Sequence, residues 1–204
     1  MKISADGKTV FVTSEVANVV HAVDLASGKV AANIKAGKRP RRFALTPDGA
    51  QLWVTNELDA SVTVIDTAKR SALGTINFEV KGARKADITP VGIVMNREGT
   101  RAFVSLGKAN HVAFVDVATR KVTSQVLVGK RAWGVGLDKA QKTLFVVNGL
   151  SDDMTIIDID SNTSAASTQR SGEGATPCRL MSSKAASAND AIGAGGEEGV
   201  SGES

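Results

Sequence analysis

Basic side chains that could bind an anion gather in three short segments of the sequence. Segment 37–42 reads GKRPRR, segment 81–85 reads KGARK, and segment 129–134 reads GKRAWG. Their candidate binding residues are Lys38, Arg39, Arg41, Arg42, Lys81, Arg84, Lys85, Lys130, Arg131 and Trp133. Clustered ammonium and guanidinium groups attract anionic ligands and steer acidic partners. The sequence therefore predicts a docking surface for an anionic ligand or an acidic partner protein, with ordinary solvated loop charges as the alternative.

Residues that would indicate catalysis or metal binding form no recognisable pattern. His21 and His111 occupy different positions of the internal repeat described below, so we predict no metal site. The single cysteine, Cys178, excludes an internal disulfide and a cysteine zinc cluster. The sequence contains no G-x-S-x-G elbow and no P-loop or dinucleotide fingerprint. We therefore predict no catalytic residue from motifs.

The basic segments lie between copies of an internal repeat, which begin near residues 3, 45, 95 and 137. Each copy carries an aromatic residue at the same place of its second strand: Phe11, Trp53, Phe103 and Phe145. Each third strand ends in an aspartate: Asp24, Asp66, Asp116 and Asp158. Four short strands in about 42 residues match one blade of a β-propeller. The sequence therefore predicts an all-β propeller of four-stranded antiparallel blades, with about four repeats in an incomplete ring.

The repeated residues have predicted structural roles. We expect the aromatic residues to pack between neighbouring blades, because one blade alone cannot bury both of its faces. We expect each aspartate to accept hydrogen bonds from backbone N–H groups of the following turn. The pairs Asp6-Gly7 and Asp48-Gly49 predict two-residue hairpins between the first and second strands.

Radial stacking of blades would place the basic segments on one face of the molecule. The link between blades and the loop between the second and third strands reach the same end of each blade. The link after the second repeat also carries an insertion of about eight residues, within 79–89. An insertion in one repeat maps to a loop that is often on the binding face.

The strand and turn motifs resemble a known family. The Phe/Trp-Val-Thr strands, the Asp-Gly turns and the third strands ending in Val/Ile-Asp are similar to the YVTN family of bacterial β-propeller repeats. Longer stretches resemble a subgroup of it, the β-propeller protein associated with pyrroloquinoline quinone (PQQ)-dependent catabolism. These stretches are 37–49, 52–68, 79–93, 109–122, 126–135 and 146–155. The resemblance covers roughly residues 1–160.

The resemblance implies an exported, periplasmic propeller of seven blades that is linked to alcohol oxidation by quinoproteins. It implies no catalytic residue and no bound cofactor, only a functional link to PQQ. Our leading hypothesis is a non-enzymatic binding or scaffold protein whose partner is a quinoprotein dehydrogenase, its acidic cytochrome, or PQQ itself. The alternative is a propeller enzyme, such as a lactonase or a quinoprotein dehydrogenase subunit.

Charge and hydropathy argue against a nucleic-acid partner and against a membrane-spanning helix. The net charge is +4, and the segment from Ser161 onward carries three basic and five acidic residues, so the repeats carry +6. That excess is modest and aromatic residues do not interleave with the basic segments, so we expect no nucleic-acid partner. No apolar run approaches the roughly 18 residues of a membrane-spanning helix.

The sequence changes character after Asp160. Residues 1–160 form the predicted propeller repeats, and residues 161–204 are rich in serine, alanine and glycine. We predict a disordered tail for 161–204, because such a composition buries too little apolar surface, and we expect no fourth strand near 164–168. The sequence also opens in mid-blade, without an export signal, so we expect a truncated propeller whose tail results from a reading-frame change.

Overall fold

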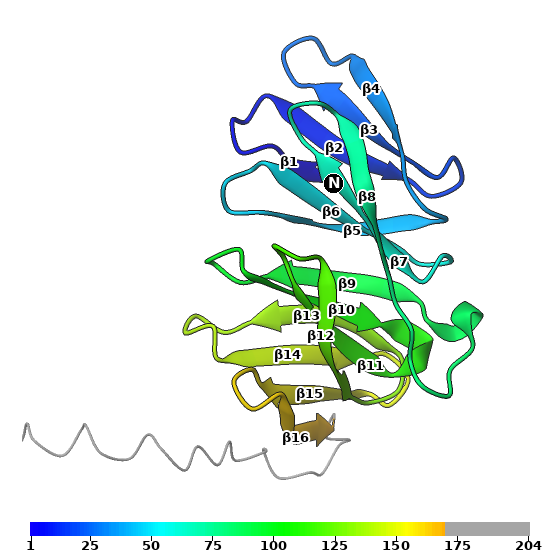
Figure 1. The fold of residues 1–204 in the computed structure, drawn as a ribbon, viewed down its shortest axis with the longest axis vertical. Coiled ribbons are helices and arrows are strands. Elements are labelled where there is room, and N and C mark those ends of the chain that lie inside the picture. The colour runs from blue at the N-terminus through cyan, green and yellow to red at the C-terminus, as the bar shows by residue number, and fades with distance from the viewer. Residues whose placement is uncertain (170–204) are drawn as a thin grey trace, which may run out of the picture. The chain divides into compact units, whose positions relative to one another are not determined.

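The computed structural model describes residues 1–169, which form four antiparallel sheets of four strands each (Figure 1). The first sheet contains β1 (Lys2–Ile3), β2 (Thr9–Ser14), β3 (Val19–Asp24) and β4 (Val30–Lys35). The second contains β5 (Pro40–Leu45), β6 (Gln51–Asn56), β7 (Ser61–Asp66) and β8 (Ser71–Asn77). The third contains β9 (Pro90–Met95), β10 (Arg101–Leu106), β11 (His111–Asp116) and β12 (Lys121–Leu127). The fourth contains β13 (Ala132–Leu137), β14 (Thr143–Asn148), β15 (Asp153–Asp158) and β16 (Thr163–Gln169).

The sheets are blades of a β-propeller, as the sequence predicts. Strands pair in chain order within each sheet, and the first strand of each sheet contacts the first strand of the next. Two short 3-10 helices, η1 (Lys85–Asp87) and η2 (Gly107–Ala109), contact each other beside the second and third blades. The four blades therefore form part of a ring, with β1, β5, β9 and β13 as the inner strands.

The hydrophobic cores lie between blades, and the repeated aromatic residue occupies each of them. Phe11 packs with Leu52 and Val54 of the second blade. Trp53 belongs to the core shared by the second and third blades, and Phe103 to the core shared by the third and fourth. All three aromatic side chains are fully buried, which confirms the predicted packing between neighbouring blades.

The repeated aspartates close the turns between third and fourth strands, which confirms their predicted role. Asp24 Oδ1 accepts hydrogen bonds from the N–H and hydroxyl of Ser27 at 2.8 and 2.7 Å. Asp116 and Asp158 make the same two bonds in their blades, and Asp66 accepts one from a backbone N–H. These bonds hold the pKa values of Asp24, Asp116 and Asp158 below the ordinary value.

The turn of the third blade predicts a pH-dependent effect of Asp116→Asn. The hydroxyl of Thr119, and then its backbone N–H, lower the pKa of Asp116 because both bond the ionised carboxylate. A depressed folded-state pKa gives stability that is present above the unfolded pKa of about 3.9 and is lost as pH falls through the folded pKa. We expect Asp116→Asn to lower the melting temperature at pH 7 and to do so less below about pH 4. Thermal unfolding from pH 7 to pH 2 measures the difference in melting temperature between Asp116→Asn and the unaltered protein. A difference that stays constant over this pH range would contradict this account.

The loops between first and second strands differ from the predicted two-residue hairpins. In the second blade the N–H of Thr46 bonds the carbonyl of Gln51, so four residues, 47–50, form the loop. Gly49 has a φ of +71°, and its N–H bonds the carbonyl of Thr46. Asp48 accepts a hydrogen bond from the N–H of Ala50, two residues later. The Asp48 side chain therefore stabilises the four-residue loop through a hydrogen bond to a backbone N–H two residues later.

The predicted start of the tail is also corrected. Residues 163–169 form β16, which pairs with β15 from Asp153↔Gln169 to Asp158↔Thr163, where we expected no strand. The exposed edge of β15 offers backbone N–H and C=O groups, and pairing with them does not require apolar side chains. The rest of the predicted tail, 170–204, lies outside the described residues.

Candidate functional site

The inner strands of the second, third and fourth blades carry a β-bulge at the same position. The pairing register shifts between Pro40 and Phe43 in β5 and between Ala132 and Val135 in β13. The pairing of β9 with β10 has an irregularity at the matching position. The bulged residues are Arg41 and Arg42, Val91 and Gly92, and Trp133 and Gly134. Bulges re-aim side chains and are frequent next to functional sites. Three predicted binding residues therefore occupy this position.

Hydroxyl groups on the second strands connect the bulges of neighbouring blades. Thr55 Oγ1 accepts the N–H of Arg42 at 3.0 Å and donates to the carbonyl of Val91 at 2.9 Å. Ser105 Oγ makes the equivalent pair of bonds one blade later: it accepts the N–H of Gly92 at 2.7 Å and donates to the carbonyl of Trp133 at 2.7 Å. Both hydroxyls are fully buried, so the relative positions of successive bulges are fixed by hydrogen bonds.

Two arginines contact one indole at these bulges. The guanidinium carbon of Arg41 lies 5.5 Å from the ring centroid of Trp133, and that of Arg131 lies 5.4 Å from it. Cation–π contacts of this kind are worth about 0.5–1 kcal/mol at exposed sites and more when water is excluded. We call Arg41, Arg131 and Trp133 the Arg–Trp cluster. It joins the inner strands of the second and fourth blades, although the sequence indicated only that Trp133 and Arg41 are equivalent positions.

Two glutamates neutralise part of the predicted basic surface. Arg41 pairs with Glu15 at 2.6 Å and with Glu57 at 3.2 Å, and Arg39 pairs with Glu15 at 3.0 Å and with Glu57 at 3.4 Å. The hydrogen bonds from Arg39 and Arg41 lower the pKa of Glu15. Glu57 Oε2 is buried near both Nε atoms but receives no well-aligned N–H, so its contacts are ionic. Arg39 and Arg41 are therefore bound to counter-ions of this chain.

The remaining cations divide into paired and unpaired groups. Arg84 Nε pairs with Asp87 at 2.7 Å. Within residues 1–169 no carboxylate lies within ion-pair distance of Lys38, Arg42, Lys81, Lys85, Lys130 or Arg131. A hollow of about 270 Å³ lies beside the bulge of the second blade and is lined by Met1, Glu15, Arg41, Arg42 and Phe43. Within the described residues, Arg42 is thus an exposed guanidinium without an ion-pair partner, at the edge of a small polar hollow.

The two Gly-Lys-Arg links have the same backbone structure. Arg39 and Arg131 have φ values of 56° and 59°, and their N–H groups donate to Oδ1 of Asn18 and Asn110 at 2.9 and 2.8 Å. The carbonyl of each arginine accepts an N–H from the loop between second and third strands of its own blade. This bonding brings the links and these loops to the same end of the blade, as predicted.

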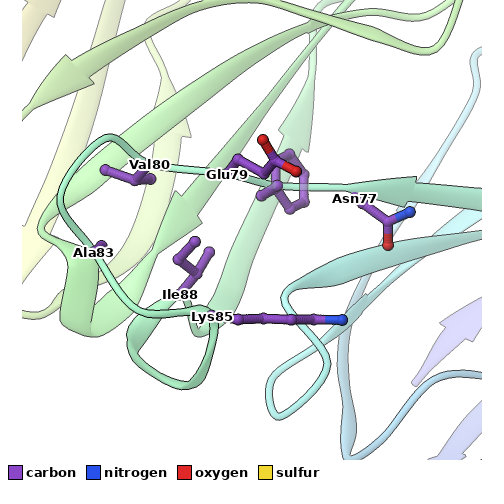
Figure 2. A pocket seen from close by; sticks show the side chains of 7 residues that line it. Asn77, Glu79, Val80, Ala83, Lys85 and Ile88 are labelled. Atoms are coloured by element: carbon purple, nitrogen blue, oxygen red, sulfur yellow. The ribbon is translucent and has the colours of Figure 1, made fainter.

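The insertion after the second blade forms a second candidate site. Its residues Val80 and Ile88 are buried in the core between the second and third blades. A pocket of about 480 Å³ lies beneath it, and Lys85 contributes to the lining (Figure 2). The predicted residues Lys81, Arg84 and Lys85 therefore belong to this insertion, whereas the other seven belong to the links and bulges.

Two features of this face were not predicted from the sequence. The bridging hydroxyls of Thr55 and Ser105 align in the repeat, so their equivalence is visible once the four copies are written in register. Exposed aliphatic side chains also occupy one position of the loops between second and third strands: Val16, Leu58 and Leu150, which are 95%, 58% and 64% exposed. Such apolar loop tips beside basic links are a composition that protein interfaces use.

Two other kinds of site are absent from the described residues. In 1–169 no three His, Cys, Asp or Glu side chains come together as metal ligands would. That same part of the chain has no helix with the length and hydropathy needed to cross a membrane.

Comparisons with known proteins agree with the fold. A family model described as "Lactonase, 7-bladed beta-propeller" matches residues 1–178. A search of curated proteins found no match. Many solved structures are similar, among them the hydrazine synthase of Kuenenia stuttgartiensis, with a TM-score of 0.71 and 24% identity. The match covers 81% of this chain and 47% of that one, so this chain spans about half the length of the hydrazine synthase chain. At this identity the similarity concerns the fold alone.

Proposed function

This chain belongs to the family of seven-bladed β-propeller lactonases, and from the site that its blades present we propose that it binds an anionic, carboxylate-bearing ligand. The observation that carries the proposal is the Arg–Trp cluster, together with Arg42, which follows Arg41 in the same bulge and has no ion-pair partner within residues 1–169. Glu15 and Glu57 hold Arg41 in place, so Arg41 positions Trp133 more than it attracts a ligand. Arg42 and Arg131 then supply the charge that a carboxylate would meet.

The geometry favours a planar or multiply charged anion. Guanidinium groups recognise carboxylates through two parallel N–H donors, and an indole offers an apolar face for stacking. The hydroxyl-bridged bulges hold these groups in place before a ligand arrives, and such preorganisation reduces the entropy lost on binding. PQQ carries three carboxylates on a planar ring system, and the resemblance of the repeats implies a functional link to it, so PQQ is the first ligand to test.

A redox protein is the macromolecular partner that fits this proposal. The resemblance implies a quinoprotein dehydrogenase or its acidic cytochrome, in the periplasm. Lys38, Lys130 and the exposed tips Leu58 and Leu150 would offer such a partner basic and apolar contacts. In this form of the proposal the chain is part of a scaffold and not of an enzyme.

Lactone hydrolysis is the second candidate function, because the family model carries that description. Opening a lactone produces a hydroxycarboxylate, so a site that binds carboxylates would also bind the product. Water is the nucleophile, and the alkoxide leaving group must receive a proton. We assign no residue of this chain to that proton transfer.

The variant Arg131→Ala tests the binding site. Calorimetric titration of the complete protein with PQQ or citrate should show binding that Arg131→Ala weakens about tenfold, as expected for a charge-assisted hydrogen bond. Arg120→Ala is a matched control, because Arg120 also has a positive φ, of 57°, and lies in a turn between third and fourth strands. Equal weakening by both variants would contradict the proposal.

A parallel assay separates the two candidate functions. A pH-stat records acid release from aliphatic lactones that are added to the complete protein. Turnover that Arg131→Ala abolishes and Arg120→Ala preserves would establish the enzyme. Ligand binding with no turnover would support the binding protein.

A further inference from the structure

Every core between two blades is built from the same two sets of positions. A blade presents one apolar face to the blade before it in the chain, which we call its rear face, and the opposite face, its forward face, to the blade after it. In the core between the first and second blades, the rear face of the second blade contributes Phe43, Leu45, Leu52, Val54 and Ile65. The side chains from the forward face of the first blade include Phe11, Val20, Ala22 and Ile34.

The equivalent positions form the other two cores. The rear faces of the third and fourth blades contribute Ile93, Met95, Ala102, Val104 and Val115, and Val135, Leu137, Leu144, Val146 and Ile157. The forward faces of the second and third blades contribute Trp53, Val62, Val64 and Ile76, and Phe103, Val112, Phe114 and Val126. The three internal interfaces are therefore copies of one interface, in which a forward face meets a rear face.

Two faces of this kind have no blade against them within residues 1–169. The rear-face positions of the first blade hold Met1, Ile3, Val10, Val12 and Val23, and the forward-face positions of the fourth blade hold Phe145, Met154 and Ile156. All of these side chains are at least partly exposed, and none belongs to the three cores of the described residues. Adjacent apolar side chains that face water mark an interaction surface.

The two open faces are complementary to each other. At each internal interface an aromatic residue of the forward face packs against aliphatic residues of the rear face. Phe145 supplies that aromatic residue on the fourth blade, and the first blade offers aliphatic residues at the receiving positions. Val147 extends the forward face, because it occupies the position of Thr55 and Ser105, whose hydroxyls bond the next blade. The fourth blade of one molecule can therefore receive the first blade of another as the internal interfaces do.

We propose that the first blade of a second copy of this chain packs on the fourth blade, and that two copies close one ring of eight blades. A contact between two different faces is heterologous, and such contacts form a ring when the rotation between copies closes. Eight blades exceed the seven of the family description by one and remain within the range of about four to eight that propellers use. The inference concerns the faces of the blades and does not rest on the ligand proposed for the Arg–Trp cluster.

The mass of the full 204-residue chain in solution tests the proposal. Light scattering after size-exclusion chromatography, at micromolar concentration, should give twice the chain mass of 21.1 kDa. A folded monomer of 21.1 kDa would overturn the proposal. Assemblies that keep growing with concentration would overturn the closed ring, because a heterologous contact that does not close adds copies without limit.

Two substitutions, one on each open face, test which faces meet. Val147 and Ile3 are 52% and 51% exposed, so a lysine at either position leaves the blades folded. Val147→Lys and Ile3→Lys should each weaken the dimer at least about tenfold, because each buries an unpaired ammonium in both interfaces of the ring. An equimolar mixture of the two variants should recover a dimer, since one of its two interfaces joins an unaltered forward face to an unaltered rear face.

Leu127→Lys is the matched control. Leu127 is 65% exposed in β12, at the position that holds Lys35 and Asn77 in the first two blades, and it lies outside both sets of face positions. This variant should keep the dimer, and its loss would contradict the proposal. Loss of the dimer in Val147→Lys but not in Ile3→Lys would mean that two forward faces meet, which would also overturn it. Circular dichroism of each variant checks that the blades remain folded, and none of these outcomes depends on ligand binding at Arg131.

Discussion

Replacing Phe103 with alanine should lower the free energy of unfolding by about 4 kcal/mol, within the usual range for a buried phenylalanine. Phe103 is fully buried in β10 and packs with Leu144 and Val146 of the next blade. Its ring also meets Phe114 edge to face, with centroids 5.0 Å apart and an interplanar angle of 83°. The substitution removes both contacts and leaves a cavity between two blades. Urea unfolding followed by circular dichroism measures the loss.

Phe145→Ala is the matched control for that loss. Phe145 occupies the same repeat position in the fourth blade, but it is only half-buried and belongs to none of the three core clusters of the described residues. We expect it to cost less than half as much, about 1–2 kcal/mol, because less apolar surface is removed. Equal losses at both positions would mean that the phenylalanines stabilise their own blades and not the contact between blades.

Replacing Gly92 with alanine should lower the free energy of unfolding by about 3 kcal/mol, because overpacking forces backbone shifts. A Cβ on Gly92 would meet the carbonyl oxygen of Trp133 directly, as well as Ser105 Oγ at 3.0 Å and the nitrogen of Val135 at 3.2 Å. Two of these neighbours are backbone atoms of β13, which cannot rotate away. The bulge of the fourth blade would have to move, and Trp133 would move with it. The weakened Arg–Trp cluster would then lower the affinity for PQQ or citrate.

Gly136→Ala separates this steric effect from the general effect of adding a methyl group. Gly136 also lies in an inner strand, and a Cβ there meets no atom within 4 Å. Alanine reduces the entropy of the unfolded chain, so the change should be neutral or stabilise by about 0.5 kcal/mol. Urea unfolding of both variants provides the comparison. A similar loss in both would contradict the proposed close approach of the third and fourth blades.

Much of the fold could be predicted because each blade repeats a local pattern. The third strands end at Asp24, Asp66, Asp116 and Asp158, as predicted, because each aspartate binds the N–H of its own turn a few residues later. The core positions of Phe11, Trp53 and Phe103 followed from the recurrence of an aromatic residue at the same place of each second strand. Such interactions involve neighbours in the sequence or equivalent neighbours in the next copy.

The site was harder to predict because its contacts join residues that are not equivalent. Glu15 and Glu57 belong to loops of two different blades, yet both pair with Arg41. Nothing in the local sequence around Arg41 indicates that its charge is already balanced. The contact between Arg41 and Trp133 depends on the bulges of two inner strands, and a bulge adds a residue without a motif that marks it. The strand β16 was missed for a similar reason, since its pairing uses backbone groups.

The cores shared between blades have a consequence for how such a protein grows in evolution. Each of the three clusters takes its side chains from two neighbouring blades. The stability of a repeat array is then approximately a sum over repeats and over their nearest-neighbour interfaces. Duplicating one blade copies one such interface and leaves the others intact. A gain or loss of one blade therefore keeps the same type of contact at each interface, while the loops on one face can diverge independently, as the insertion at 79–89 has done.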